Sequence, residues 1–176
     1  MSTSASSLTF KNKIALLAHV AIAGIVLITA GAAWSLRAQI IEGRIAGLMI
    51  AVQSQRSIAA AYEAKAGKGE MTVEAAQKAA MDALRLARFG GADGKANYFF
   101  IWDNDGVGVM HPFKPEWIGH SMIRKLLEPS GKDVIDALVK AARASSDGTA
   151  FVPMMFPRPG KTEPVSKLQY VRRSQR

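Results

Sequence analysis

The chain has no cysteine, so it can form neither a disulfide framework nor a thiolate zinc site. It also lacks the motifs that indicate several common enzyme classes. The Gly-x-Ser-x-Gly nucleophile motif, the phosphate-binding P-loop and the glycine pattern of dinucleotide-binding folds are all absent from the sequence. No candidate nucleophile has a recognisable partner. We therefore predict a protein that has no catalytic residues, is not an enzyme and needs no cofactor.

Metal ions and nucleic acids are also disfavoured as ligands. The acidic turn at residues 103–106 would need further acidic ligands to bind calcium, at positions where the chain has Ile101 and Pro112. His111 and His120 lie on either side of a proline-containing loop and have no third ligand at a useful spacing. The net charge of +9 is spread along the chain without a recognition helix or stacking motif. We expect no metal site and no nucleic-acid partner.

Charge is missing between Lys13 and Arg37. Residues 14–36 form an uncharged run that, as a helix rising about 1.5 Å per residue, can cross the roughly 30 Å hydrocarbon core of a bilayer. The lysines before it place residues 1–13 in the cytoplasm and everything after the span outside. The small residues 30–33 leave a cleaved signal peptide as the alternative. We favour a retained transmembrane anchor, because the helical pattern continues through Arg37 without a break.

Beyond the span, residues 35–65 predict a long amphipathic helix. Its apolar stripe consists of Ile40, Ile41, Ile45, Leu48, Met49, Val52 and Ile58. The stripe is more extensive than one small domain can cover, so we predict that this helix also mediates homodimerisation. Gly67 and Gly69 interrupt it, and Thr72 is placed to cap a second helix that runs through Arg88. The residues expected to face inward from this second helix are Val73, Ala76, Ala80, Ala83, Leu84 and Leu86.

The middle of the chain predicts a hairpin. Bulky apolar residues occupy both the odd and the even positions of residues 98–102, as expected for a strand that is covered on both faces. Asparagine, aspartate and glycine at residues 103–106 form a turn. The return strand, residues 107–111, is stopped by Pro112, which has no amide donor for a sheet. His111 is therefore expected at a strand end.

The last third predicts one helix and two strands. Residues 133–144 have helical periodicity, with Val134, Ile135, Leu138 and Val139 directed inward. Residues 149–157 form an apolar strand whose internal proline places it near an edge or a bulge. Residues 167–172 form a last short strand. Together with the preceding elements, these patterns define an α+β protein.

Three basic side chains lie at the edges of the predicted sheet: Arg88, His111 and Lys167. If they converge in an aromatic pocket, such donors would suit a small carboxylate. From spacing alone, the alternative that each is a solvated surface group is favoured.

Several short motifs follow one another in a fixed order. They are Arg-Phe-Gly (88–90), Tyr-Phe-Phe-Ile (98–101), Asp-Asn-Asp-Gly (103–106), Met-His-Pro (110–112), Pro-Arg-Pro-Gly (157–160) and Lys-Leu-x-Tyr (167–170). This combination resembles the single Cache domain of type 2, the periplasmic sensor module of many bacterial methyl-accepting chemotaxis receptors and some sensor kinases. The resemblance runs from about residue 39 to residue 172.

The resemblance implies a PAS-like fold with a long N-terminal helix, a central antiparallel sheet and a pocket for small organic acids such as acetate, propionate, pyruvate or lactate. It implies that six residues face or border this pocket: Arg88, Tyr98, Phe100, His111, Lys167 and Tyr170. It further implies an anchor in the bacterial inner membrane, with residues 37–176 as a periplasmic sensor domain that serves chemotaxis or signal transduction.

Members of this family continue into a final strand, a second membrane span, a HAMP linker and a signalling coiled coil. This sequence ends at Arg176, so we expect a sensor domain that is incomplete at its C-terminus. The alternative to a working sensor is a non-signalling receptor fragment or gene remnant that binds no ligand.

Overall fold

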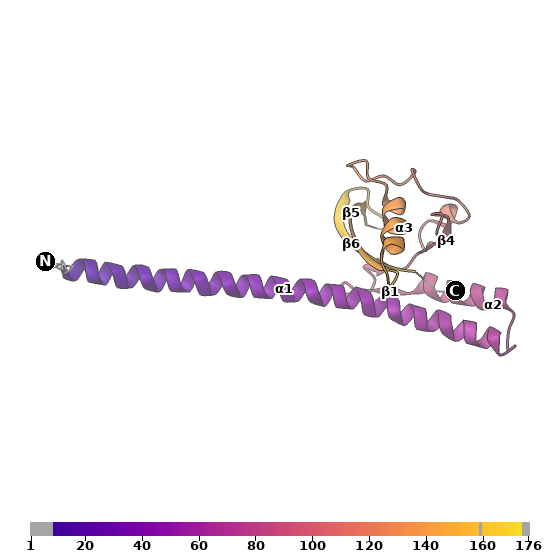
Figure 1. Cartoon of the computed structure of the whole chain (residues 1–176), viewed down its shortest axis with the longest axis horizontal. Helices are drawn as coiled ribbons and strands as arrows, with labels where there is room; N and C mark the ends of the chain where they lie inside the picture. Colours follow the sequence, from indigo (N-terminus) through magenta and orange to yellow (C-terminus); the bar gives the residue numbers. More distant parts are fainter. Residues whose placement is uncertain (1–8, 159, 174–176) are drawn as a thin grey trace. The chain divides into compact units, whose positions relative to one another are not determined.

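The computed structural model of the chain describes residues 9–158 and 160–173. The helices are α1 (Phe10–Gly67), α2 (Val73–Leu86), the 3-10 helix η1 (Pro115–Trp117) and α3 (Val134–Ala144). The strands are β1 (Arg88–Phe89), β2 (Asn97–Tyr98), β3 (Ile101–Trp102), β4 (Gly108–Met110), β5 (Thr149–Pro157) and β6 (Pro164–Arg172) (Figure 1). All three strand pairs are antiparallel, which confirms the α+β class and the antiparallel pairing predicted from the sequence.

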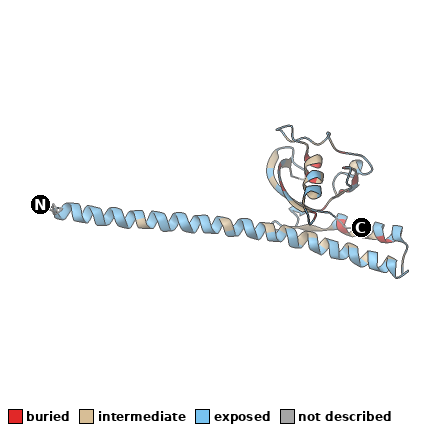
Figure 2. Ribbon diagram, viewed as in Figure 1, coloured by how far each residue is buried: buried red, intermediate tan, exposed pale blue. Residues whose placement is uncertain are grey.

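The N-terminal part of α1 has the properties of a membrane span. The chain divides into two compact units, residues 1–47 and residues 48–176, with the boundary inside α1. Figure 2 shows most of this segment as exposed, and its apolar residues, for example Leu17, Ile28 and Trp34, are exposed as well. Among the described residues, α1 is the one helix long and apolar enough to cross a membrane. It begins at Phe10, four residues before the predicted start of the span at Ile14.

Helix α2 begins as predicted but ends earlier. The Thr72 hydroxyl oxygen accepts a hydrogen bond from the Ala75 amide at 3.1 Å, which is the expected N-terminal cap. The helix ends at Leu86 because Ala87 is extended, so the prediction that it runs through Arg88 is wrong. The prediction of which residues of this helix face inward is only partly correct. Val73 and Leu86 are exposed, the latter because it lies about half a turn around the helix from the buried Leu84.

The strand predicted over residues 98–102 is divided into two in the structure. Its first part, in β2, pairs with β1, whereas its second part, β3, pairs with β4. The register of the second pair is irregular between Ile101 and Trp102, and such irregularities re-aim side chains. The turn that follows is as predicted: the Asp103 carboxylate accepts the amides of Asp105 and Val107, each at 2.8 Å.

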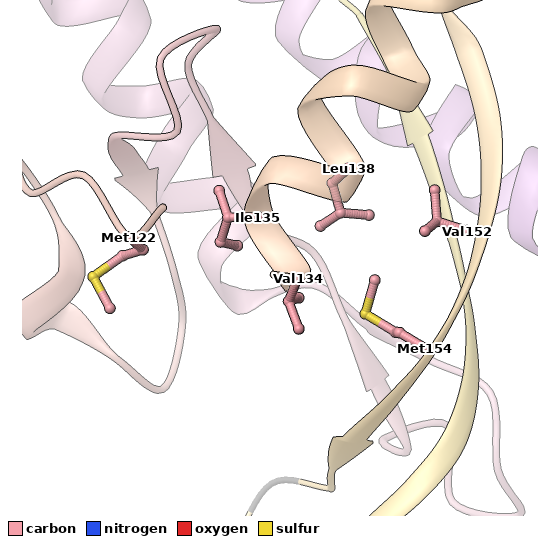
Figure 3. Close-up of a cluster of buried hydrophobic side chains, with 6 residues drawn as sticks. All are labelled: Met122, Val134, Ile135, Leu138, Val152 and Met154. Carbon is pink, nitrogen blue, oxygen red and sulfur yellow. The ribbon is translucent and has the colours of Figure 1, made fainter. Parts of the chain in front are cut away.

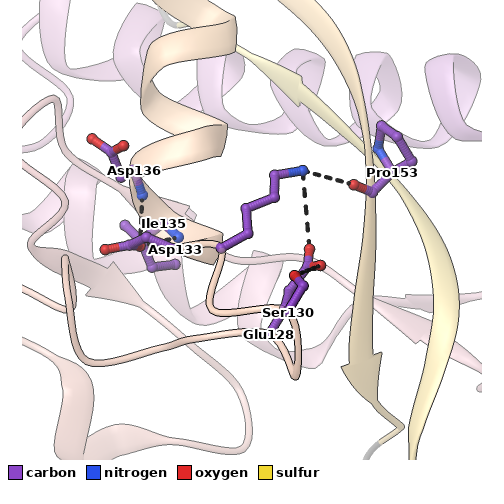
Figure 4. A network of polar contacts seen from close by, with 7 residues as sticks. Glu128, Ser130, Asp133, Ile135, Asp136 and Pro153 are labelled. Atoms are coloured by element: carbon purple, nitrogen blue, oxygen red, sulfur yellow. Dashed lines mark hydrogen bonds and ion pairs between the residues drawn. The ribbon is translucent and has the colours of Figure 1, made fainter.

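The longest sheet is the β5–β6 hairpin, in which nine residue pairs lie in register from Thr149↔Arg172 to Pro157↔Pro164. Strand β6 thus begins earlier than the predicted residue 167. Among the described residues, this sheet has two strands, so β5 keeps a free edge, as its internal proline predicted. The Pro153 carbonyl accepts a hydrogen bond at 3.2 Å from the Lys132 ammonium (Figure 4). The same ammonium lies 4.0 Å from Oε1 of the Glu128 carboxylate.

Helix α3 packs against this hairpin and supplies much of the core. The Asp133 carboxylate caps the helix by accepting the amides of Ile135 and Asp136, each at 3.0 Å (Figure 4). The helix then buries three of its four predicted inward residues. One cluster of buried residues consists of Met122, Val134, Ile135, Leu138, Val152 and Met154 (Figure 3). Burial of each such side chain is worth about 1.5–3 kcal/mol.

A second cluster joins β4 to the helices of the same unit. Leu84, Phe99 and Met110 are buried in it, and Ala51 and Val52 of α1 pack against them. Met110 is completely buried, with 0% of its surface exposed. This cluster therefore uses part of the apolar stripe of α1 inside one chain.

Candidate functional site

A small aromatic cavity lies within the second unit, where β2–β4, α3 and the β5–β6 hairpin meet. Its lining residues are Tyr98, Phe100, Trp102, His111, Trp117, Leu126, Val134, Ile135, Leu138, Phe156 and Gln169. The cavity has a volume of about 20 Å³. By the same kind of measure, a single water needs about 10–15 Å³, so this conformation holds one or two waters. An organic acid of two to four carbons requires neighbouring side chains to move.

His111 lies at the centre of the aromatic lining. Its ring centre is 4.9 Å from that of Trp117 and 5.3 Å from that of Tyr98. The Phe100 ring lies 6.5 Å away and nearly parallel to it, at 13°. Only 6% of the His111 surface is exposed. The predicted position of His111 at a strand end thus places its imidazole among aromatic groups.

The protonation of His111 follows from these surroundings. Burial is the main cause that lowers the pKa of His111 from 6.5 to about 4, with Glu116 opposing the change and Lys114 adding to it. The Phe113 amide donates to Nδ1 of His111 at 3.2 Å, so the neutral ring carries its proton on Nε2. At neutral pH, His111 is therefore a neutral hydrogen-bond donor, whereas the sequence had suggested a cation.

Tyr98 supplies a second donor at the cavity. Burial raises the pKa of the Tyr98 phenol, so the hydroxyl stays protonated over the physiological range. Its ring meets that of Phe113 edge-on at 5.0 Å and that of Phe100 at 6.4 Å. These contacts hold the ring without requiring its hydroxyl.

The structure does not bring Arg88 into the cavity. Its guanidinium donates to the carbonyls of Arg85 and Ala87, each at 2.7 Å. The same group lies 4.8 Å from the centre of the Phe113 ring. Since Phe113 packs against Tyr98, Arg88 stands behind the aromatic residues and not among those that line the cavity.

Lys167 and Tyr170 lie on different faces of β6. Side chains alternate along a strand, so Lys167 shares a face with Gln169, which lines the cavity, and Tyr170 takes the other face. The Tyr170 ring accordingly packs 4.7 Å from that of Phe151. The Lys167 ammonium donates to the Pro157 carbonyl at 2.5 Å.

Lys167 borders the cavity without lining it. Its ammonium lies 5.7 Å from the centre of the Phe156 ring, which is part of the lining. Burial, and after it the charge of Arg158, lowers the pKa of Lys167. Of the six residues predicted for the pocket, three therefore line the cavity, Lys167 and Arg88 flank it, and Tyr170 points away.

Four polar or aromatic lining residues were not predicted: Trp102, Trp117, Phe156 and Gln169. For Gln169, the signal was the alternation along the last strand, because it lies two positions after Lys167. For Trp102, the same spacing of two runs from Phe100. Trp117 belongs to η1, and no local pattern predicts that its ring centre lies 6.1 Å from that of Trp102.

Comparison with known proteins gives a consistent result. Residues 40–176 match the model of the family described as Single Cache domain 2. The methyl-accepting chemotaxis protein McpP of Pseudomonas putida is 31% identical over 120 residues, which are 68% of this chain and 21% of McpP. The chain thus spans about a fifth of the length of that curated relative.

Solved structures share the fold. The periplasmic sensor domain of a chemotaxis protein is 31% identical, with a TM-score of 0.66 over 77% of this chain and 89% of that one. A structure that reports the basis for carboxylic acid recognition by a Cache chemosensory domain is 30% identical, with a TM-score of 0.66 over 76% and 86% of the two chains. A Vibrio parahaemolyticus methyl-accepting chemotaxis protein, 22% identical with a TM-score of 0.58 over 75% and 80% of the two chains, shares the fold. The family match and the shared fold agree with the resemblance found in the sequence motifs, and the chain belongs to the Single Cache domain 2 family.

Proposed function

We propose that this chain is a membrane-anchored, extracytoplasmic sensor domain that binds a small organic acid for chemotaxis or signal transduction and performs no catalysis. The observation that carries the proposal is the aromatic cavity, whose lining includes the hydrogen-bond donors Tyr98 and His111 with ring centres 5.3 Å apart. One structural relative recognises carboxylic acids, which supports the same ligand class.

The lining of the cavity suits a carboxylate of few carbons. An anion removed from water needs hydrogen-bond donors to replace its hydration, and Tyr98 and His111 supply neutral ones. Lys167 is the cation best placed to add charge. Since burial lowers the pKa of its ammonium, a neighbouring carboxylate would favour the charged form and gain a charge-assisted hydrogen bond. We expect Lys167 to leave the Pro157 carbonyl and turn toward the ligand as the cavity opens.

Isothermal titration calorimetry on the full chain in lipid nanodiscs tests ligand binding. Acetate, propionate, pyruvate and lactate are the probes. Trp102 and Trp117 line the cavity, so their fluorescence should change with the same midpoint. The variant Trp34→Phe removes the tryptophan of the apolar segment and should leave that change intact. If a folded chain shows neither heat nor a fluorescence change with any of the four acids, the proposal fails and the alternative of a non-binding receptor fragment stands.

Substitutions test which residues hold the carboxylate. Lys167→Ala and His111→Ala should each weaken binding by about ten- to a hundredfold, as expected when a donor worth about 1.5–3 kcal/mol is lost. Arg88→Ala should have a smaller effect, because its guanidinium binds backbone carbonyls outside the cavity. The exposed Lys161→Ala is the matched control for lost positive charge. Equal affinity of Lys167→Ala and the parent would remove Lys167 from the site.

The anchor is part of the same proposal. We expect residues 14–36 to span the inner membrane with residues 1–13 in the cytoplasm, because Lys11 and Lys13 flank the apolar run on that side. Reporter fusions after residue 176 should be active only when the reporter works outside the cytoplasm. High activity of a cytoplasmic reporter at that position would contradict the topology.

We also propose that two copies of the chain pair through α1. The helix keeps apolar side chains exposed within one copy, among them Ile41, Met49 and Ile50. Val52 instead packs into its own domain and is less available to a partner. Single cysteines introduced at residues 41–52 test this pairing. The yield of disulfide-linked dimer should vary with helical periodicity along these positions and should be lowest at position 52. Cross-linking that is uniform along the helix would count against a specific dimer.

A further inference from the structure

Gln169, one of the residues that line the cavity, has a polar side-chain atom with no partner among the residues that the structure describes. The side-chain oxygen Oε1 of Gln169 is buried and accepts no hydrogen bond from any residue that the structure describes. Gln169 itself is part of the cavity lining. Buried polar atoms in folded proteins are nearly always paired, so this oxygen is open to a donor from the cavity's occupant, which is a water in the free protein and a ligand group in the complex.

The register of the β5–β6 hairpin holds Gln169 in this place. Gln169 lies opposite Val152, and the next residue of β5 on the same face is Met154, opposite Lys167. Val152 and Met154 are buried and apolar, so neither can donate a hydrogen bond. The Lys167 ammonium is bonded to the Pro157 carbonyl in this conformation, and on leaving it would turn to the ligand's carboxylate. The neighbours of Gln169 in the hairpin therefore leave its oxygen free.

A carboxylate alone cannot pair with this oxygen, because an ionised carboxylate only accepts hydrogen bonds. A hydroxyl group beside the carboxylate can. Its proton would be donated to Gln169, while the carboxylate accepts from Tyr98, His111 and the Lys167 ammonium that has turned toward it. We propose that the pocket prefers 2-hydroxy monocarboxylates over the corresponding unsubstituted and 2-keto acids, and that Gln169 is the residue that makes this distinction. The inference rests on the proposed function, since it assumes that an organic acid occupies the cavity.

Three acids of the same carbon number isolate the group at C2: lactate carries a hydroxyl, pyruvate a carbonyl and propionate hydrogens. Calorimetry on the full chain in nanodiscs should show that lactate binds at least ten times more tightly than propionate and pyruvate. A site with a buried polar group discriminates in this way because the analogue that lacks the hydroxyl leaves the group unpaired. Propionate or pyruvate binding as tightly as lactate would overturn the inference and leave the proposed function standing. The absence of binding of all three would overturn both.

The variant Gln169→Met tests the residue itself. Methionine keeps most of the length of the side chain and removes the acceptor. We expect the ratio of lactate to propionate affinity to fall to about one, with propionate affinity unchanged or improved. The matched control is Gln55→Met, since Gln55 of α1 also has a buried, unpaired oxygen but does not line the cavity. A lactate preference that survives in Gln169→Met, or is lost in Gln55→Met, would contradict the assignment.

The unfolding temperature without ligand separates this role from a purely structural one. Removing an unpaired buried acceptor should leave the unfolding temperature of Gln169→Met equal to that of the parent or higher. A large fall in unfolding temperature would show that the oxygen has a partner inside the protein and would refute the inference. If the variant does not fold, the lactate, pyruvate and propionate affinities of the parent chain still decide the question.

Discussion

His111 should make the stability of the domain depend on pH between about pH 6.5 and pH 4. Its side chain is 6% exposed and its pKa is lowered from 6.5 to about 4, chiefly by burial. The unfolded chain therefore binds a proton at this residue at pH values where the folded chain does not. Because stability rises with pH wherever the unfolded state binds more protons, acidification from pH 6.5 toward pH 4 favours unfolding.

The size of this effect follows from the two pKa values. Relative to pH 8, the linkage relation gives a loss of about 2 kcal/mol at pH 5 and about 3 kcal/mol once the pH falls below 4. The loss is complete below the folded pKa, where both states carry the proton. Asp147 contributes outside this window, because hydrogen bonds, first of all from Ser145, hold the pKa of that carboxyl at about 2. Its stabilisation is present above the ordinary pKa and is lost only as the pH falls toward 2.

Urea unfolding of the full chain in detergent measures the prediction. Trp102 and Trp117 report on unfolding, since both line the cavity around His111. Between pH 8 and pH 5, the free energy of unfolding of the parent should fall by about 2 kcal/mol more than that of His111→Gln, which has no proton to gain. The control His120→Gln changes an exposed histidine of the neighbouring loop and should behave as the parent does. Equal pH dependence of the parent and His111→Gln would refute the reasoning.

Two further predictions concern the core and the loop that leads into α3. Met110→Ala should lower the free energy of unfolding in urea by about 2–5 kcal/mol, because its side chain is fully buried, whereas the exposed Met155→Ala should cost much less. A similar cost for both methionines would show that burial does not decide their contribution. Asp133→Ala should lower the free energy of unfolding by about 1–2 kcal/mol through the loss of the helix cap. It should lower this free energy further because the Arg124 amide, which also donates to this carboxylate, loses its acceptor. Asp133→Asn keeps the capping oxygen but not the second acceptor, so its unfolding free energy should lie between those of the parent and Asp133→Ala.

Several features depend on residues a few positions apart, and these could be predicted from the sequence. The uncharged run at residues 14–36 needs only its length to predict a span. Thr72 and Ala75 meet within one helical turn, so the cap of α2 was visible in the sequence. The turn at residues 103–106 is likewise closed by its own side chains. Local patterns of this kind determined the order and type of most elements, and the motifs between residues 88 and 170 determined the family.

Which residues line the cavity depends on contacts between residues far apart in the chain, so the tertiary structure and not the sequence determines the lining. Residues 98–102 form two strands and not one because their two ends pair with different partners, β1 and β4. Arg88 was expected at the pocket, but the carbonyls of Arg85 and Ala87 hold its guanidinium outside the cavity lining. No pattern within the sequence shows that these donors are already used.

The last strand gives the clearest division between the two sources of information. Alternation along residues 167–170 shows from the sequence alone that Lys167 and Gln169 share one face and Tyr170 takes the other. It does not show which face meets the core. That choice is made by the pairing of Gln169 with Val152, whose side chain is buried under α3 on the same face. A strand presents two faces that are equivalent in local geometry, so only a contact made across the fold can decide which of them lines a cavity.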